Sequence, residues 1–168
     1  MNKPRAADAS ARFKDVGVVL VVDAVPGAEL LGVEFYADGL QRRFFASSLV
    51  AKRNRAVMAF PLEQPPMQVR VVWRDSSKIV GRKDNPNVDT YDGNILGDYT
   101  IPIASRIPDS VVEALKRNRK GDLRLKFRLK PDGVLFGWDI ERRPGWKPGL
   151  SVAPVYEDVG GDFSDTLY

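Results

Sequence analysis

Two neighbouring segments in the last third of the chain alternate apolar and polar residues, and this alternation constrains the fold most. The first runs from Leu123 to Lys130 and the second from Val134 to Glu141. A period of two places successive side chains on opposite faces of a β-strand, so both segments predict strands with one buried face. Between them, Asp132-Gly133 predicts a tight turn that joins the two strands as an antiparallel hairpin.

This turn also predicts which residues face each other. Pairing on either side of Asp132-Gly133 brings the two apolar faces together and places opposite charges across from each other, an arrangement that stabilises a sheet. The expected pairs are Leu129 with Phe136, Phe127 with Trp138, Leu125 with Ile140, Lys126 with Asp139, and Arg124 with Glu141.

Shorter extended segments bounded by turn residues fill the first part of the chain. Strands are predicted over 16–25, 30–37, 40–46, 55–60, 67–73 and 99–103, and Pro102 confines the last to an edge or a strand end. A second hairpin at Asp38-Gly39 predicts Ala37 opposite Leu40. That register sets Val33 against Phe44, Glu34 against Arg43 and Phe35 against Arg42. Residues 75–97 are rich in loop formers and predict one long loop.

A helix is expected after Pro108. Asp109 or Ser110 can cap it, Ser110 and Glu113 have the spacing of a capping box, and Gly121 is placed to end it. Its apolar stripe is Val111, Val112 and Leu115. Prolines and glycines after residue 143 predict an irregular tail.

These elements predict a mainly β, α+β fold: an antiparallel, sandwich-like domain of about seven to nine strands with one short helix. The expected organisation is a flexible lead over 1–15, a single β-rich domain over 16–143, and an irregular tail over 144–168 that packs on the domain.

The chain has neither cysteine nor histidine, which constrains its chemistry. Thiolate nucleophiles, disulfides and the commonest general base near neutral pH are therefore excluded. Paired carboxylates or a Ser-Lys pair remain in principle, from Asp23, Asp75, Asp139, Ser76 and Lys78, but no nucleophile elbow, phosphate loop or dinucleotide motif accompanies them. We therefore predict no enzymatic activity and no cofactor.

The acidic stretch from Asp84 to Gly93 resembles a calcium loop in composition only. Hard cations prefer clustered oxygen ligands, but the spacing departs from the calcium-loop pattern and no Glu follows at the bidentate position. A solvated loop or a partner-binding loop is the better interpretation, and no metal is predicted.

A basic row on one face of the predicted hairpin suggests a nucleic-acid patch, together with the basic helix end over 116–120. The aromatic residues of the hairpin fall on the opposite, core-facing side, where they cannot stack on bases. We expect instead a solvated face, partly paired with Asp139 and Glu141. The row is Arg124, Lys126, Arg128 and Lys130.

Trp146 lies with Arg142, Arg143 and Tyr156 in the irregular tail. Trp, Tyr and Arg are the side chains that most often anchor protein interfaces. The alternative is that Trp146 and Tyr156 only attach the tail to the domain, and the sequence leaves both open.

Several short sequence segments in the second half of the chain resemble those of immunity proteins encoded beside bacterial type VI secretion lipase effectors. They are Asp98-Tyr-Thr-Ile-Pro-Ile103, the helix after Ile107-Pro-Asp109, residues 133–145 and Val159-Gly-Gly-Asp-Phe163. The resemblance covers residues 67–163. It implies binding to a toxic phospholipase and steric blocking of substrate access, and it implies a periplasmic location. The sequence has no export signal and no lipobox Cys, so the cytoplasm is the alternative location.

The partner-binding residues are predicted in the long loop and at the start of the tail. The predicted partner is the cognate phospholipase, with no membrane span. The alternatives are a basic nucleic-acid-binding module, or a structural subunit of a phage or secretion apparatus. The predicted residues are Lys78, Arg82, Lys83, Asp84, Asn87, Asp89, Tyr91, Asp92, Arg142, Arg143 and Trp146.

Overall fold

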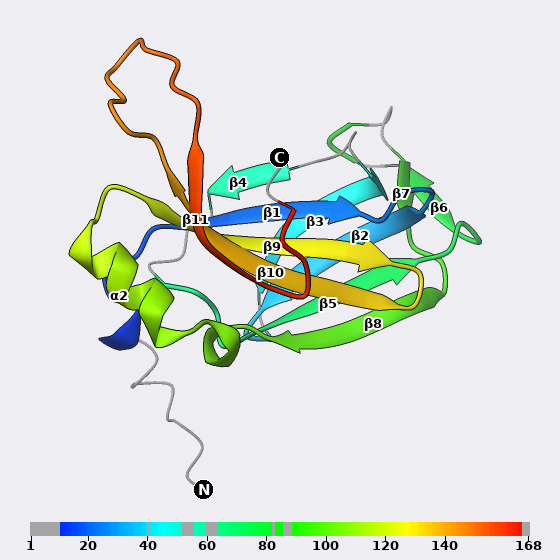
Figure 1. The fold of residues 1–168 in the computed structure, drawn as a ribbon. Coiled ribbons are helices and arrows are strands. Elements are labelled where there is room, and N and C mark those ends of the chain that lie inside the picture. The colour runs from blue at the N-terminus through cyan, green and yellow to red at the C-terminus, as the bar shows by residue number, and fades with distance from the viewer. Residues whose placement is uncertain are drawn as a thin grey trace, which may run out of the picture.

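Two β-sheets packed face to face make up most of the molecule, and a small third sheet lies at one end (Figure 1). The computed structural model describes residues 11–39, 41–51, 56–59, 64–81, 83–85 and 89–165. The predicted fold class, mainly β and sandwich-like with a short helix, is confirmed.

The first sheet has five strands in the order β11-β10-β9-β1-β4, and the second has four in the order β3-β2-β5-β8. Strands β1 and β9 run parallel, and all other paired strands are antiparallel. The five strands are β11 (Val155–Gly161), β10 (Gly133–Arg142), β9 (Asp122–Lys130), β1 (Val18–Ala24) and β4 (Ala56–Ala59). The four are β3 (Gln41–Val50), β2 (Glu29–Ala37), β5 (Gln68–Arg74) and β8 (Ile95–Pro102).

Apolar side chains from the inner faces of both sheets form one core. Phe35 of β2 meets Phe127 of β9 edge to face, with ring centroids 5.2 Å apart, and this contact joins the two layers. In the second sheet Trp73 stacks on Tyr99 at 5.3 Å. Gly97 leaves room for that indole, because a Cβ there would lie 2.1 Å from Cε2 of Trp73. The period-two pattern therefore identified the buried face correctly.

The β9–β10 hairpin has the predicted faces in a different register. Lys130 pairs with Gly133, so the turn residues are Pro131 and Asp132 instead of Asp132 and Gly133. Proline suits the first central position of a turn because its φ is already fixed. Each predicted pair is displaced by two residues, which keeps every side chain on its face. The observed pairs include Phe127 with Phe136, Leu125 with Trp138, Arg124 with Asp139, and Asp122 with Glu141.

The predicted register of the β2–β3 hairpin is wrong. Ala37 pairs with Gln41, and a bulge after Phe35 then places Phe35 opposite Phe44 instead of Arg42. Asp38 and Gly39 both have positive φ, which makes the turn. The bulge adds one residue to a strand and lets the two rings pack edge to face at 5.3 Å inside the core.

The segment 75–97 is not one long loop. It contains β6 (Ile79–Gly81) and β7 (Asp89–Tyr91), which pair as a small two-stranded sheet, and it includes the start of β8. The described residues therefore form eleven strands, more than expected. Pro102 ends β8, an edge strand, as predicted.

Helix α2 (Asp109–Arg117) covers one end of the sandwich and follows a short 3-10 turn, η1 (Ala104–Arg106) (Figure 1). Its predicted apolar stripe, Val111, Val112 and Leu115, is buried. The predicted caps are wrong: the N-cap is Pro108 with no side-chain cap, and the C-cap is Asn118, not Gly121. At the C-terminal end, a tertiary contact from Arg142 to the carbonyls of Ala114 and Asn118 replaces the predicted cap.

Both ends of the chain differ from the prediction. Phe13, inside the predicted flexible lead, is fully buried in the core, so that prediction fails for the described part of the lead. The tail is not irregular throughout, because residues 155–161 form β11 and extend the five-stranded sheet. Glycine at 160 and 161 favours this pairing, since a Cβ on either would clash with Trp138 or Gly137.

Candidate protein-binding surfaces

The basic row of β9 is not a solvated face. Arg124 and Lys126 are only 1% and 0% exposed, and both bind Asp139 of β10, which is 0% exposed. Arg124 donates to both carboxylate oxygens at 2.6 and 2.7 Å, and Lys126 Nζ lies 3.1 Å from Oδ2. Arg128 pairs in the same way with Asp23 of β1, at 2.9 and 3.0 Å. Burial lowers the pKa of Lys126.

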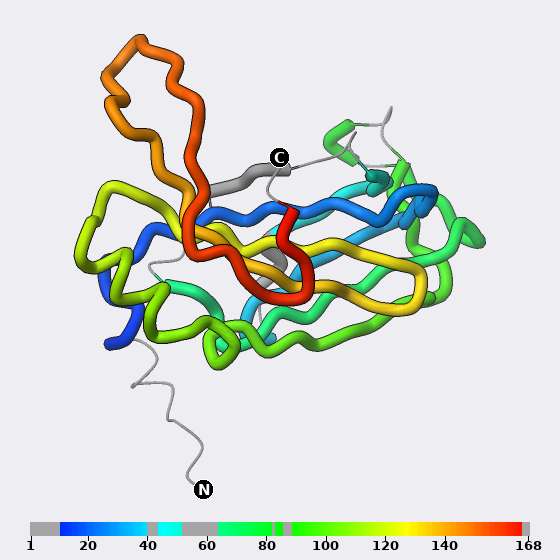
Figure 2. Tube along the Cα trace, viewed as in Figure 1, coloured from blue at the N-terminus to red at the C-terminus, as the bar shows by residue number. Residues whose placement is uncertain are grey.

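The C-terminal segment covers this row, which the sequence pattern did not indicate. Figure 2 shows the segment, in red, crossing in front of β10 and β9. Tyr156 lies over the Arg124 guanidinium at 3.9 Å, and Phe163 lies over Lys126 and Arg128. Lys126 also donates to the Asp165 carbonyl. Tyr156 therefore attaches the tail to the domain, one of the two alternatives that the sequence left open for it.

The predicted partner-binding residues of 78–92 gather on the β6–β7 hairpin. Lys78 and Asp92 form an ion pair of 3.1 Å beside the strands. Lys83, Asp84 and Asp89 are exposed and Tyr91 is half-buried; Arg82 and Asn87 lie outside the described residues.

The base of this hairpin is fixed by Asp75. Its carboxylate accepts hydrogen bonds from the hydroxyl and amide of Ser77, and from the amide and side chain of Asn94. These donors, the Ser77 hydroxyl first, lower the pKa of Asp75 to about 2. The hairpin is thus held on the sandwich by charge-assisted hydrogen bonds.

The segment from Arg143 to Pro154 forms a projecting arm between β10 and β11 (Figure 1). Trp146 and Leu150 on this arm are 56% and 52% exposed. Arg143 is half-exposed and pairs with Glu141 at 2.9 Å. The arm therefore leaves a Trp and an Arg accessible to solvent, two of the residue types that most often anchor protein interfaces.

Arg142 serves the fold at the base of the arm. Its guanidinium donates to the carbonyls of Ala114, Asn118 and Lys120, at 2.8–3.2 Å, and to Glu157 at 2.7 Å. It thus satisfies carbonyls at the C-terminal end of α2 and links them to β11. Gly121 makes room for it. Because these contacts occupy its side chain, we leave Arg142 out of the proposed docking surface.

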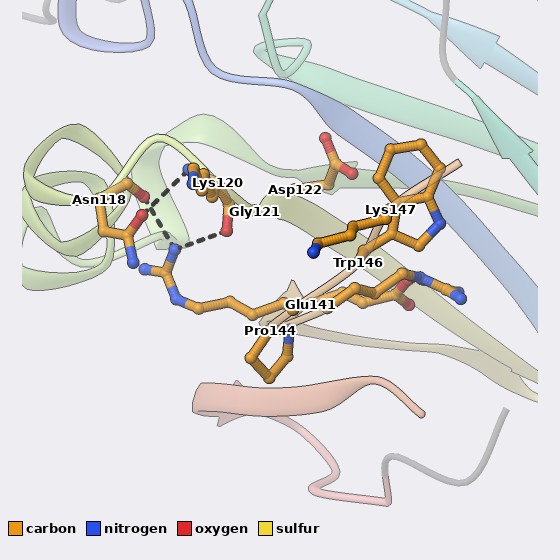
Figure 3. Close-up of a pocket in the computed structure, with 11 residues that line it drawn as sticks. Asn118, Lys120, Gly121, Asp122, Glu141, Pro144, Trp146 and Lys147 are labelled. Atoms are coloured by element: carbon orange, nitrogen blue, oxygen red, sulfur yellow. Dashed lines mark hydrogen bonds and ion pairs between the residues drawn. The ribbon is translucent and has the colours of Figure 1, made fainter. Parts of the chain in front are cut away.

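A pocket of about 760 Å³ lies where the arm leaves the sheet (Figure 3). Asp122 and Glu141 of the sheet line it, and Trp146 and Lys147 line it from the arm. Burial and the facing Glu141 raise the pKa of Asp122. Its remaining lining residues are Asn118, Lys120, Gly121, Arg142, Arg143, Pro144 and Gly145.

The two predicted binding segments lie at opposite ends of the sandwich (Figure 1). Exposed large apolar side chains among the described residues divide between the same two regions. One group is Ile79, Val80, Ile95 and Leu96, around the β6–β7 hairpin, and the other is Trp146, Leu150, Val155 and Val159, on the arm and β11. The residues that the sequence predicted to bind one partner therefore lie on two separate surfaces.

Sequence reasoning missed Asp122 and Glu141 as residues of a pocket. Their facing positions follow only from the observed register, and the pocket needs the end of α2 and the arm as well. The signal that was available in the sequence is the acidic residue at the end of each alternating strand, next to a tail that contains a tryptophan.

Within the described part of the chain, no three or more Asp or Glu side chains come together as a metal site would require. No helix of that part is long and apolar enough to cross a membrane. Comparisons with protein families, curated proteins and solved structures found no match to this chain.

Proposed function

We propose that this protein is an immunity protein that binds a type VI secretion phospholipase effector and blocks its active site sterically. The observation that carries the proposal is the projecting arm, whose Trp146 and Leu150 side chains are more than half exposed. An exposed Trp on a segment that extends beyond a rigid sandwich suits insertion into a concave surface. The resemblance of residues 67–163 to such proteins supplies the class of partner.

The arm leaves the sheet beside firmly held neighbours. Arg142 joins the end of α2 to β11 where the arm begins, and β11 pairs with β10 where it returns. Because the base of the arm is already fixed, the arm loses less conformational entropy when it binds a partner. Such an arm occludes a lipase cleft without chemistry of its own.

A nucleic-acid-binding module remains the rival from another class. The burial of Arg124 and Lys126 removes them from any phosphate contact, which leaves the exposed basic end of α2 and its following turn. Binding through those residues would weaken steeply as salt rises, in proportion to the phosphates contacted.

The test is complex formation with a phospholipase encoded by an adjacent gene. We expect a stable one-to-one complex in size-exclusion chromatography with light scattering, and loss of phospholipid hydrolysis on titration with this protein. Trp146→Ala is expected to weaken inhibition about thirtyfold or more, as for an interface anchor.

Leu96→Ala is the matched control, because Leu96 is a comparably exposed apolar residue at the opposite end of the sandwich. If Trp146→Ala inhibits the phospholipase as well as the wild type does, and Leu96→Ala no longer inhibits it, the docking surface lies at the β6–β7 end instead. Hydrolysis of phospholipid by this protein alone, or self-assembly of this protein into large particles, would refute the proposal.

A further inference from the structure

The projecting arm contains two copies of the same four-residue turn. Arg143-Pro-Gly-Trp146 and Lys147-Pro-Gly-Leu150 follow each other directly, and each begins with a basic residue and ends with a large apolar one. In each turn the amide of the last residue donates to the carbonyl of the first, at 3.2 and 3.0 Å. The two glycines have φ of 74° and 81°, which suits the third position of a type II turn. The arm is therefore a tandem repeat with a defined backbone.

The turns hold the arm in shape where the sandwich gives it little support. Residues 143–150 are all exposed. A Cβ on Gly145 or Gly149 would meet no other atom within 4 Å, so nothing packs against the arm at those corners. Because each proline fixes its own φ, the arm keeps Trp146 and Leu150 at equivalent positions of successive turns.

Positive charge gathers at this end of the sandwich. The exposed segment 116–121, at the end of α2, and the arm both line the pocket of Figure 3, so the two are neighbours. Segments 116–121 and 143–150 together contain six Lys or Arg residues and no Asp or Glu. Asp122 and Glu141, the two carboxylates that line the pocket, offset only part of this charge.

Most of these cations have no partner within the described part of the chain. Arg119 lies 3.8 Å from Asp15, and Arg143 pairs with Glu141. No ion pair to a described residue is formed by the other four, which are therefore available to an external anion. They are Lys116, Arg117, Lys120 and Lys147.

Large apolar side chains are exposed beside these cations. Trp146 and Leu150 are more than half exposed, and so nearly are Val155 and Val159 of β11, the strand to which the arm returns, at 47% and 40%. Aliphatic side chains do not stack on bases, so this group does not favour a nucleic acid. An anionic bilayer suits all three features, because lipid accepts aliphatic groups, the interface accepts indoles, and headgroup phosphates attract Lys and Arg.

The opposite end of the sandwich shows that exposed apolar residues alone do not select such a partner. Ile79, Val80, Ile95 and Leu96 are exposed there. The segment 75–97 that contains them has three Lys or Arg residues and four Asp. Its balance of charge is negative, so an anionic surface is not attracted to that end.

We propose that the arm and the neighbouring segment 116–121 dock this protein on a bilayer that contains anionic phospholipids. Trp146 and Leu150 enter the headgroup region, and the unpaired cations lie against lipid phosphates. The inference does not rest on the proposed function. A partner cleft and a bilayer would bind the same arm at different times.

The test uses the whole protein with sucrose-loaded vesicles, made either of phosphatidylcholine or of an equal mixture of phosphatidylcholine and phosphatidylglycerol. Sedimentation measures binding. Tryptophan fluorescence reports insertion through Trp146, because Trp73 and Trp138 are buried at 1% and 8% exposure. We expect binding to the mixed vesicles that weakens as salt rises, with a blue shift and less quenching by acrylamide, and little binding to phosphatidylcholine alone.

Variants separate the apolar and the charged contributions in the sedimentation assay. Trp146→Ala is expected to weaken binding about tenfold or more, since a large apolar side chain no longer leaves water. Lys147→Gln removes one unpaired cation and should weaken it about fivefold. The controls are Leu96→Ala, at the opposite end of the sandwich, and Lys130→Gln, at the far turn of the β9–β10 hairpin, where Lys130 pairs with Asp132. Both should bind as the wild type does.

Several results would overturn the inference: no binding to the mixed vesicles, equal binding to both kinds, or an unchanged affinity in Trp146→Ala. Displacement from the vesicles by glycerophosphoglycerol, the soluble headgroup, would indicate a phosphate site without a bilayer. Tighter binding to a single-stranded oligonucleotide at the same salt concentration would assign the surface to nucleic acid. Because no phospholipase is present, failure here is separate from failure of the immunity function.

Discussion

Replacing Asp139 with asparagine should destabilise the fold strongly while changing almost no volume. Asp139 is fully buried and neutralises both Arg124 and Lys126, which are buried as well. Removing one partner of a buried ionic group leaves uncompensated charge and typically costs about 3–5 kcal/mol. Since domains are stable by only about 5–15 kcal/mol, this is a large fraction of the total. For a chain of this length it corresponds to a melting temperature lower by about 6–20 °C.

Urea unfolding followed by circular dichroism measures the effect, with a lower midpoint and an unchanged slope expected. Asp98→Asn is the matched control. Asp98 accepts two hydrogen bonds from Arg70 across neighbouring strands, at 2.8 and 2.6 Å, in the same geometry as Asp139 and Arg124. That pair is 48% and 40% exposed, so water screens it and its loss should have a much smaller effect. Similar losses in the two variants would refute the argument that burial sets the size of the effect.

Three further outcomes are expected. Phe163→Ala removes the ring over the basic row and should lower the free energy of unfolding by about 1–3 kcal/mol, with faster amide exchange along the C-terminal segment. Gly97→Ala forces a methyl group into a buried indole and should cost about 1–3 kcal/mol or more, whereas Gly133→Ala meets only a flexible lysine and should stay near neutral; parallel urea titrations compare the two. The lowered pKa of Asp75 means that the stability it contributes is complete above the ordinary pKa of an aspartate and is lost as the pH falls toward about 2. Ser77→Ala should raise that pKa, which carboxyl ¹³C NMR follows; an unchanged titration would argue against the assigned hydrogen bonds.

Register was the part of the sheet that local patterns predicted least well. In the β9–β10 hairpin the turn formed one residue earlier than expected, which moved every pair by two positions but left every face correct. In β2–β3 a bulge changed the partner of Phe35, because packing two aromatic rings in the core outweighed a regular ladder. The first difference comes from a single residue at the turn, and the second from one residue at the turn together with one in the bulge.

For the helix too, the buried face was predicted correctly and the ends were not. Its buried stripe followed from the spacing of Val111, Val112 and Leu115, but its caps did not follow from Ser110 or Gly121. Arg142, more than twenty residues away, binds the last carbonyls instead. A cap supplied by tertiary contact leaves no local signature.

The sequence by itself determined most strands of the two large sheets and, where side chains alternate, the face that enters the core, because alternation depends only on the direction of successive Cβ atoms. Only the tertiary structure decided what covers the other face. Lys126 is buried by a contact with Asp165, 39 residues later, and Arg128 pairs with Asp23, 105 residues earlier. Burial of a charge depends on partners that distant segments bring to it, so a row that looks solvated in the sequence became a closed ionic cluster. The arm and its pocket arose in the same way, from three elements that are neighbours only in the fold.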